Sequence, residues 1–410
     1  MKIGKHRTLH LSRLFEGDKV IWMVLLLLCV VSVLEVYSAS SNMSYHGGAY
    51  WKPVLGHTVT IALGVIVAWV VHKIPCRYFG WIVVVGPLLS VVMLLTALLT
   101  SATVNGSARW FDIWGVSFQP SEIAKGSLIV VVAWLLSVMR DENNKATMSA
   151  FKWIAVISAI ICGLIVPENF STAALTAFVV LLMMIVGQVP WKPLGIVLGI
   201  VAIAGSIGYS TLKFSSEETI QSISELPMLH RLPTWAHRLN NHTDFPENPD
   251  SFDLSTNPQI TQAHVAIATC NVIGKGPGNS TVRDFLPQAY SDFIYAIIIE
   301  ELGLWGGALV MLMYLILLYR AARIASRCEK NFPAFLIMGL ALLIATQAMI
   351  NMSVAVGLAP VTGQPLPLVS RGGSSILMNC AYLGMMLSIS RTARQRGDEH
   401  DPILSPSDKA

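Results

Sequence analysis

Residues 21–36 read Ile-Trp-Met-Val-Leu-Leu-Leu-Leu-Cys-Val-Val-Ser-Val-Leu-Glu-Val, an apolar run that contains one charged residue, Glu35. A transmembrane helix needs about 20 predominantly apolar residues. A basic segment precedes this run, as in a signal peptide, but no small-residue cleavage site is evident and many similar runs follow. We therefore predict that the run is a retained first transmembrane helix.

The composition of the whole chain supports the same prediction. Of the 410 residues, 54% are apolar and 13% are charged, whereas ordinary globular domains have about 25% charged residues. The net charge of +4 is small, and no basic stripe with interleaved aromatic residues suggests nucleic-acid binding. The six cysteines have no C-x-x-C spacing, so we expect buried thiols and no disulfide or zinc site.

Apolar runs of membrane-spanning length predict an all-α polytopic membrane protein with about ten transmembrane helices. The predicted spans are residues 20–38, 54–72, 79–100, 122–139, 153–167, 171–187, 193–212, 292–319, 334–355 and 374–390. The fifth and sixth spans are short and meet at residues 167–172, which indicates a broken or tightly turned pair of helices.

The basic residues predict how the helices are oriented. Nineteen of the 28 Lys and Arg residues lie in residues 2–19, 73–77, 140–152, 192, 320–330 and 391–409. These segments alternate along the predicted spans and include both ends of the chain. Because cytoplasmic loops are enriched in Lys and Arg, we predict that both termini are cytoplasmic.

The chain divides into a cytoplasmic N-terminal segment (1–19), a membrane domain (20–390) and a cytoplasmic tail (391–410). Within the membrane domain, a large extracytoplasmic loop (213–291) connects helices 7 and 8. This loop holds eight acidic and five basic residues and is too long for a simple connector. We expect short amphipathic helices near residues 222–238 and 259–273 within it.

The first group of polar residues near the membrane is Gln-Pro-Ser-Glu-Ile-Ala-Lys at residues 119–125. Pro120 suits the start of a helix, and Glu122 suits the positive end of the helix dipole. Glu122 and Lys125 are three residues apart on one helix face and can form an ion pair. This pair could be structural, or Lys125 together with Arg109 could bind an anionic head group.

The second group is Phe-Leu-Pro-Gln-Ala-Tyr-Ser-Asp-Phe at residues 285–293. Ser291 and Asp292 are both suitable helix N-caps. Asp292 also lies where the chain enters the bilayer, and a carboxylate there can serve as a general base. Glu300 and Glu301 lie deeper in the same helix, where we expect them to have structural roles.

The third group is Pro-Val-Thr-Gly-Gln-Pro-Leu-Pro-Leu-Val-Ser-Arg-Gly-Gly-Ser-Ser at residues 360–375. Its prolines and glycines exclude a regular helix, and non-helical backbone at membrane depth must be buried in protein or line a cavity. The Gly-Gly-Ser-Ser turn, which includes Ser374, offers backbone N–H groups to an anion. Residues 274–280 superficially resemble a phosphate loop, but we expect only a turn there.

Together these groups predict an outward-facing cavity. Its rim is formed by Arg109, Glu122, Lys125, Asp292 and a Gly-rich re-entrant loop. Ionisable residues within a membrane are costly and usually functional. A transporter and a lipid-processing enzyme both remain compatible with this cavity. A redox or nucleotide-driven machine is disfavoured because no cofactor motif is present.

Four ordered stretches resemble the SEDS family (shape, elongation, division and sporulation). They are residues 109–110, 118–125, 286–303 and 360–375, and the similarity extends over residues 20–395. The resemblance implies a ten-helix fold and peptidoglycan glycosyltransferase activity on lipid II. It is greater to the division members of the family than to its elongation (RodA-like) members.

The resemblance also implies roles for individual residues. Asp292 matches the family's essential loop aspartate, and Arg109, Glu122 and Lys125 match polar residues that line its central cavity. The family's Pro-Asp-x-Gly-Thr motif corresponds to residues 167–172, where Asn169 occupies the acidic position and makes a required charge there doubtful. We therefore expect Asp292 to be catalytic, with Arg109, Glu122, Lys125, Asn169 and Ser374 binding the substrate.

The expected reaction is an inverting glycosyl transfer with Asp292 as general base. A divalent cation (Mg²⁺ or Mn²⁺) could assist, although no carboxylate cluster identifies its ligands, and no organic cofactor is expected.

The implied partners are lipid II, the nascent glycan strand, an FtsI-like class B penicillin-binding protein transpeptidase and other division-site membrane proteins. The implied location is the bacterial cytoplasmic membrane at the division septum. The alternatives are a lipid II flippase and an elongation-type polymerase.

Overall fold

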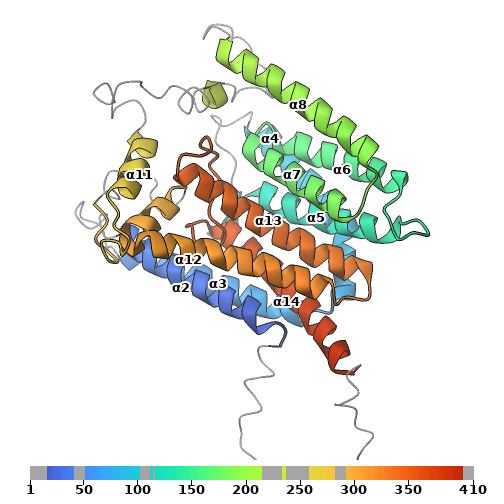
Figure 1. Cartoon of the computed structure of the whole chain (residues 1–410), viewed down its shortest axis with the longest axis horizontal. Helices are drawn as coiled ribbons and strands as arrows, with labels where there is room; N and C mark the ends of the chain where they lie inside the picture. The colour runs from blue at the N-terminus through green and yellow to red at the C-terminus, as the bar shows by residue number, and fades with distance from the viewer. Residues whose placement is uncertain are drawn as a thin grey trace, which may run out of the picture.

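The computed structural model describes residues 16–40, 51–101, 111–113, 116–214, 233–236, 258–281 and 292–399. Ten apolar helices form a bundle in these residues (Figure 1). They are α2 (Lys19–Ser40), α3 (Trp51–Lys73), α4 (Ile82–Ser101), α5 (Pro120–Val138), α6 (Met148–Ile165), α7 (Phe170–Val186), α8 (Trp191–Phe214), α12 (Ile294–Ala325), α13 (Asn331–Ala355) and α14 (Gly373–Glu399). A 3₁₀ helix (Cys76–Trp81) precedes α4, and the shorter helix α11 (Pro258–Ala268) precedes α12.

Each predicted span coincides with one of these ten helices, so the predicted fold class is confirmed. Nine of the helices are long and apolar enough to cross a membrane, and α7 is an apolar helix of 17 residues. The short connection between α6 and α7 confirms the predicted tight pair, and α11 confirms the predicted helix near residues 259–273. Of the predicted helix near residues 222–238, the described part is the helical turn at 233–236.

A small hairpin was not predicted. β1 (Phe111–Ile113) pairs antiparallel with β2 (Val116–Phe118), directly before α5. Strands of three residues are too short to show an alternation of apolar and polar positions, so they leave no recognisable pattern in the sequence. The hairpin therefore adds a detail to an otherwise helical fold.

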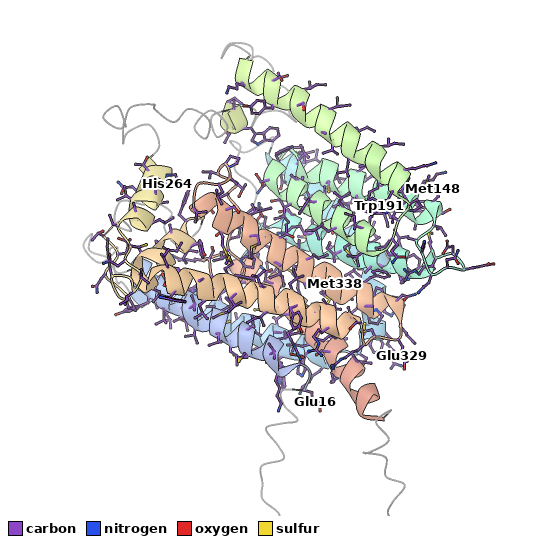
Figure 2. All side chains as sticks on the ribbon, in the orientation of Figure 1. Glu16, Met148, Trp191, His264, Glu329 and Met338 are labelled. Atoms are coloured by element: carbon purple, nitrogen blue, oxygen red, sulfur yellow. The ribbon has the colours of Figure 1, made fainter. Side chains whose placement is uncertain are left out.

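The most buried spans of the bundle are those of α5, α13 and α14. In Figure 1, α12 and α13 lie side by side, and α5 packs against α13. Residues 124–133 of α5 are buried without interruption, as expected of a helix that is apolar on all sides. In contrast, α8 lies along the outside of the bundle with most of its surface exposed, and Trp191 at its start is 72% exposed (Figure 2). Its apolar surface is suited to contact with lipid.

Helix α12 is broken at Gly303, where φ is 74° and ψ is −177°. This left-handed region is open to glycine and costly for most other residues. The break divides α12 into a short first part (residues 294–302) and a long second part (304–325). The sequence pattern predicted one continuous span because hydropathy does not report the backbone conformation of a single glycine.

Residues 356–372 connect α13 to α14 without regular structure, and residues 364 and 366–370 of this loop are buried. Gln364, Leu368 and Val369 are at most 3% exposed, which confirms that this irregular segment is buried in protein. The backbone oxygen of Val369 accepts a hydrogen bond from Ser32 of α2 at 2.7 Å, and that of Pro367 accepts one from Tyr314 of α12. Partners on neighbouring helices thus satisfy carbonyl groups that lack a helical partner.

Candidate active site

The Glu122–Lys125 ion pair lies in the first turns of α5. Lys125 Nζ is 2.9 Å from Glu122 Oε1 and donates a second hydrogen bond to Gln347 Oε1 of α13 at 3.0 Å. Lys125 is fully buried and Glu122 is 3% exposed. The predicted pairing of these residues is confirmed, as is the prediction that Pro120 begins the helix. A buried ammonium group thus lies at the start of α5 with a carboxylate beside it.

Two amide side chains of α13 hold the loop that precedes α14. Gln347 Nε2 donates to the backbone oxygen of Pro365 at 2.9 Å. Asn351, one turn later, donates to the backbone oxygen of Gln364 at 2.8 Å and to that of Asp292 at 3.0 Å. Sequence reasoning missed both residues, although polar amides within an apolar helix are themselves a signal of helix–helix hydrogen bonds.

The loop brings together the N-terminal ends of α5, α7, α12 and α14. Gln364 Nε2 donates to Thr172 Oγ1 in the first turn of α7 at 2.6 Å. Ser374, in the first turn of α14, accepts a hydrogen bond from the backbone N–H of Gln119, the N-cap of α5, at 3.3 Å. We call this end of the bundle, which the basic residues predict to face outward, the outer end. Each helix start carries partial positive charge, so together they favour an anion.

Several buried acceptors around this loop lack a hydrogen-bond partner within the described part of the chain. They are Ser121 Oγ, Glu122 Oε2, Asn351 Oδ1 and Gln364 Oε1. Buried polar groups in native proteins nearly always have a partner, which can be an ordered water or a ligand. Four such atoms at one end of the bundle therefore mark a candidate binding site.

Asp292 lies at the same end, two residues before α12, and is partly exposed. The N-cap of α12 is Phe293, so the proposed capping role of Asp292 is wrong for this helix. Its backbone oxygen is bound to Asn351, which also binds the loop of Gln364. Among the described residues, Asp292 is therefore linked through one amide to the site that contains Lys125.

Three further residues were predicted to bind the substrate: Asn169, Ser374 and Arg109. Asn169 is the N-cap of α7, and its side-chain oxygen accepts the backbone N–H of Thr172 at 3.1 Å. Ser374 is fully buried at the start of α14. Arg109 lies outside the described residues. The structure thus brings Glu122, Lys125 and Ser374 to one end, and it gives Asn169 a capping contact that requires only an oxygen acceptor.

The described part of this site fits a divalent cation poorly. No group of three or more His, Cys, Asp or Glu residues that could hold a metal ion occurs in the described segments. Mg²⁺ usually binds to one or two carboxylates together with substrate phosphates. Here one oxygen of Glu122 is already paired with the ammonium group of Lys125, which repels a cation. The expected Mg²⁺ or Mn²⁺ stays a prediction.

Comparison with known families identifies the chain. Residues 18–395 match the family of cell cycle proteins FtsW, RodA and SpoVE. This chain belongs to that family. The FtsW/RodA/SpoVE match covers the ten helices up to residue 395, within the last turns of α14, and includes every residue of the site at the outer end.

Relatives within the FtsW/RodA/SpoVE family are similar over nearly their whole length. A probable peptidoglycan glycosyltransferase FtsW of Coxiella burnetii is 30% identical over 380 residues, which are 90% of this chain and 95% of that protein. One of Trichlorobacter lovleyi is 32% identical over 388 residues, which are 92% and 94% of the two chains.

Solved structures support the fold. A chain from a study entitled "Structural coordination of polymerization and crosslinking by a peptidoglycan synthase complex" has a TM-score of 0.68 and 21% identity, and the match covers 92% of this chain and 99% of that chain. The rod shape determining protein RodA of Thermus thermophilus has a TM-score of 0.61 and 21% identity, with 92% and 97% covered.

Replacement of Asn169 tests whether this position needs a charge. We expect Asn169→Ala to lower the free energy of unfolding by about 1 kcal/mol, because the cap of α7 is lost. Asn169→Asp should keep the stability, since a carboxylate oxygen can also accept the N–H of Thr172. Thermal unfolding of the detergent-purified variants measures both changes in stability. The control is Thr147→Ala, which removes the cap of α6 together with a hydrogen bond from the Thr147 hydroxyl to the Met139 backbone oxygen. An aspartate variant as unstable as the alanine variant would contradict this account.

Proposed function

We propose that this chain is a peptidoglycan glycosyltransferase that polymerises lipid II at the outer face of the bacterial cytoplasmic membrane. The observation that carries this proposal is the buried Lys125 beside buried acceptors that have no partner among the described residues, where the starts of four helices meet. Membership of the FtsW/RodA/SpoVE family supports it, because relatives about 30% identical are named probable peptidoglycan glycosyltransferases.

The chemistry of the donor substrate suits this site. A lipid-linked sugar donor carries a diphosphate, on which negative charge develops as its bond to the sugar breaks. Lys125 and the N-terminal ends of α5, α7, α12 and α14 are fixed positive groups in a buried environment. Pre-organised charges of this kind stabilise a developing anion without further reorganisation of the site. We propose that Glu122 holds the ammonium group of Lys125 in place, and that Arg109 assists it from the preceding segment.

Asp292 is the proposed general base. The 4-hydroxyl oxygen of the acceptor sugar attacks the anomeric carbon of the donor, and the bond from that carbon to the diphosphate oxygen breaks. The hydroxyl proton passes to the Asp292 carboxylate, while the lipid diphosphate departs with the bonding electrons. Attack from the side opposite the leaving group inverts the anomeric centre. Asp292 is partly exposed and lies before the start of α12, which is compatible with this role.

A role in septal wall synthesis is the proposed cellular context. It is supported by the names of the relatives, several of which are called FtsW. The proposed partner is a class B penicillin-binding protein transpeptidase with one membrane helix, together with other division-site membrane proteins. The match to a chain from a peptidoglycan synthase complex supports this pairing.

Polymerisation of labelled lipid II by the purified chain with its cognate transpeptidase tests the function. We expect glycan ladders on a gel in the presence of both proteins. A chain that moves lipid II across vesicle membranes without forming new glycosidic bonds would instead be a transporter. The break in α12 makes that outcome worth measuring, since discontinuous helices are common in transporters.

A further inference from the structure

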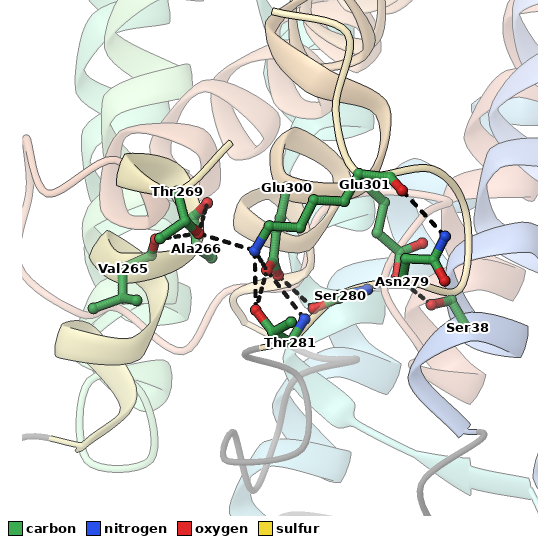
Figure 3. Close-up of polar contacts among 10 residues, drawn as sticks. Ser38, Val265, Ala266, Thr269, Asn279, Ser280, Thr281, Glu300 and Glu301 are labelled. Atoms are coloured by element: carbon green, nitrogen blue, oxygen red, sulfur yellow. Dashed lines mark hydrogen bonds and ion pairs between the residues drawn. The ribbon is translucent and has the colours of Figure 1, made fainter. Parts of the chain in front are cut away.

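The break in α12 is occupied by the loop that follows α11. At Gly303 the helix is interrupted, so the preceding carbonyl groups lose their helical donors. The backbone N–H of Lys275 donates to the backbone oxygen of Glu300 at 3.0 Å, and that of Gly276 donates to the backbone oxygen of Glu301 at 2.9 Å. Figure 3 shows Glu300 and Glu301 beside Ser280 and Thr281 of this loop. The loop therefore completes the hydrogen bonding of the first part of α12.

The side chains of Glu300 and Glu301 bind the same loop. Lys275 Nζ is 2.6 Å from Glu300 Oε1, which also accepts the backbone N–H and the hydroxyl of Thr281 at 3.1 and 2.9 Å. Glu301 accepts the backbone N–H of Gly278 at 2.9 Å and a hydroxyl hydrogen bond from Ser38 of α2. Both glutamates are at most 1% exposed. We call residues 274–281 with Glu300 and Glu301 the clamp.

Close backbone contact in the clamp requires glycine at two positions. Gly274 and Gly303 both have positive φ, at 83° and 74°. A Cβ atom on Gly274 would lie 2.3 Å from the backbone nitrogen of Gly303, and one on Gly303 would lie 2.3 Å from the backbone oxygen of Val272. The chain thus forms a specific joint here, and the expected turn at residues 274–280 is part of it.

The clamp contacts the C-terminal end of the short helix at residues 294–302. Asp292 lies just before the N-terminal end of the same helix. Residues 294–302 span about 13 Å at 1.5 Å per residue, with the clamp at the Glu300 end. Asn351 holds the backbone of Asp292 at the opposite end. A tilt of this short helix at the clamp would therefore shift Asp292 relative to Lys125.

We propose that Lys275 and Glu300 are positioning residues that fix Asp292 for the transfer reaction, an inference that rests on the proposed function. Misplacement of a reacting group by about 1 Å can reduce the rate by roughly 10²-fold. Glu300 retains hydrogen bonds from Ser280 and Thr281 when Lys275 is replaced. We therefore expect Lys275→Met to fold and bind lipid II while reacting slowly.

Steady-state kinetics of lipid II polymerisation, combined with thermal unfolding, tests the proposal. Lys275→Met should lower kcat by about tenfold or more, with little change in KM, whereas Lys275→Arg should retain most of the activity. The matched control is Arg391→Met, which removes an ion pair with Glu16 and a hydrogen bond to the backbone oxygen of Lys73 at the other end of the bundle. The side chains of Lys275 and Arg391 have similar exposure, 23% and 19%. A purely structural role would lower the unfolding temperature without this selective effect on kcat.

The outcomes separate this inference from the proposed function. If the wild type polymerises lipid II and Lys275→Met does so at the same kcat, the positioning role is wrong. The positioning role is also wrong if Arg391→Met lowers kcat equally.

If Lys275→Met does not fold, the variant Thr281→Val tests the inference instead, because it removes one hydroxyl donor to Glu300. We then expect kcat to fall by about threefold, the effect of one lost hydrogen bond, and an unchanged kcat overturns the inference. A wild type that makes no glycan overturns the proposed function itself, and the positioning role with it.

Discussion

Asp292→Asn should reduce the rate of lipid II polymerisation by about 10²–10⁴-fold, the usual contribution of a general base. An amide cannot accept the proton of the acceptor hydroxyl, while the size of the side chain is preserved. The backbone oxygen of Asp292 still accepts the hydrogen bond from Asn351 in this variant, so the chain should fold normally. Quantified glycan ladders from purified wild type and variant measure the effect.

The control for this variant is Asp141→Asn. Asp141 lies in the exposed turn between α5 and α6, where its carboxylate accepts the backbone N–H of Lys145 at 2.8 Å. It lies at the end of α5 opposite the proposed site, so we expect ladders of normal intensity. Asp292→Asn with wild-type ladders would show that the base is another residue, and Glu122 would be the next to test.

Lys125→Met should be both unstable and inactive. Removal of one partner from a buried ion pair typically costs 3–5 kcal/mol, because the other charge remains buried without compensation. Lys125 is fully buried and Glu122 nearly so. Loss of a fixed positive charge at a developing anion typically lowers kcat by about 10²–10³-fold. Thermal unfolding and polymerisation rates of the same preparation give the two effects separately.

The double variant Glu122→Gln/Lys125→Met distinguishes a structural ion pair from a functional one. With both charges gone, the uncompensated carboxylate disappears, and we expect most of the lost stability to return. Polymerisation should stay low, because the positive charge near the leaving diphosphate is still missing. A double variant that regains both stability and activity would mean that the pair only holds α5 in place.

Much of the site was visible in the sequence because its key contacts are local. Glu122 and Lys125 are three residues apart, so helical geometry alone brings them together, and the structure has them 2.9 Å apart. Pro120 predicted the start of α5 for a similar reason. Gln347, Asn351 and Gln364 were missed because their partners, such as Asp292 and Thr172, lie far away in sequence.

The contact between the two glutamates and the loop in the clamp also could not be predicted from the sequence. The sequence predicted that Glu300 and Glu301 are structural and that residues 274–280 form a turn, but it did not relate the two. Their contact depends on the break at Gly303, which lies in an otherwise apolar helical run. Hydropathy and periodicity describe side chains, and the break is a property of the backbone.

By itself, the sequence determined that this chain crosses a membrane about ten times and which ionisable residues occur near the membrane. In lipid, backbone groups need hydrogen-bond partners within the protein, and a helix supplies them within one segment, so a long apolar run predicts a helix from its local composition. Only the tertiary structure decided that the starts of α5, α7, α12 and α14 meet around one buried loop. The physical reason is that contacts between helices depend on packing and on individual hydrogen bonds, which link residues more than 100 positions apart.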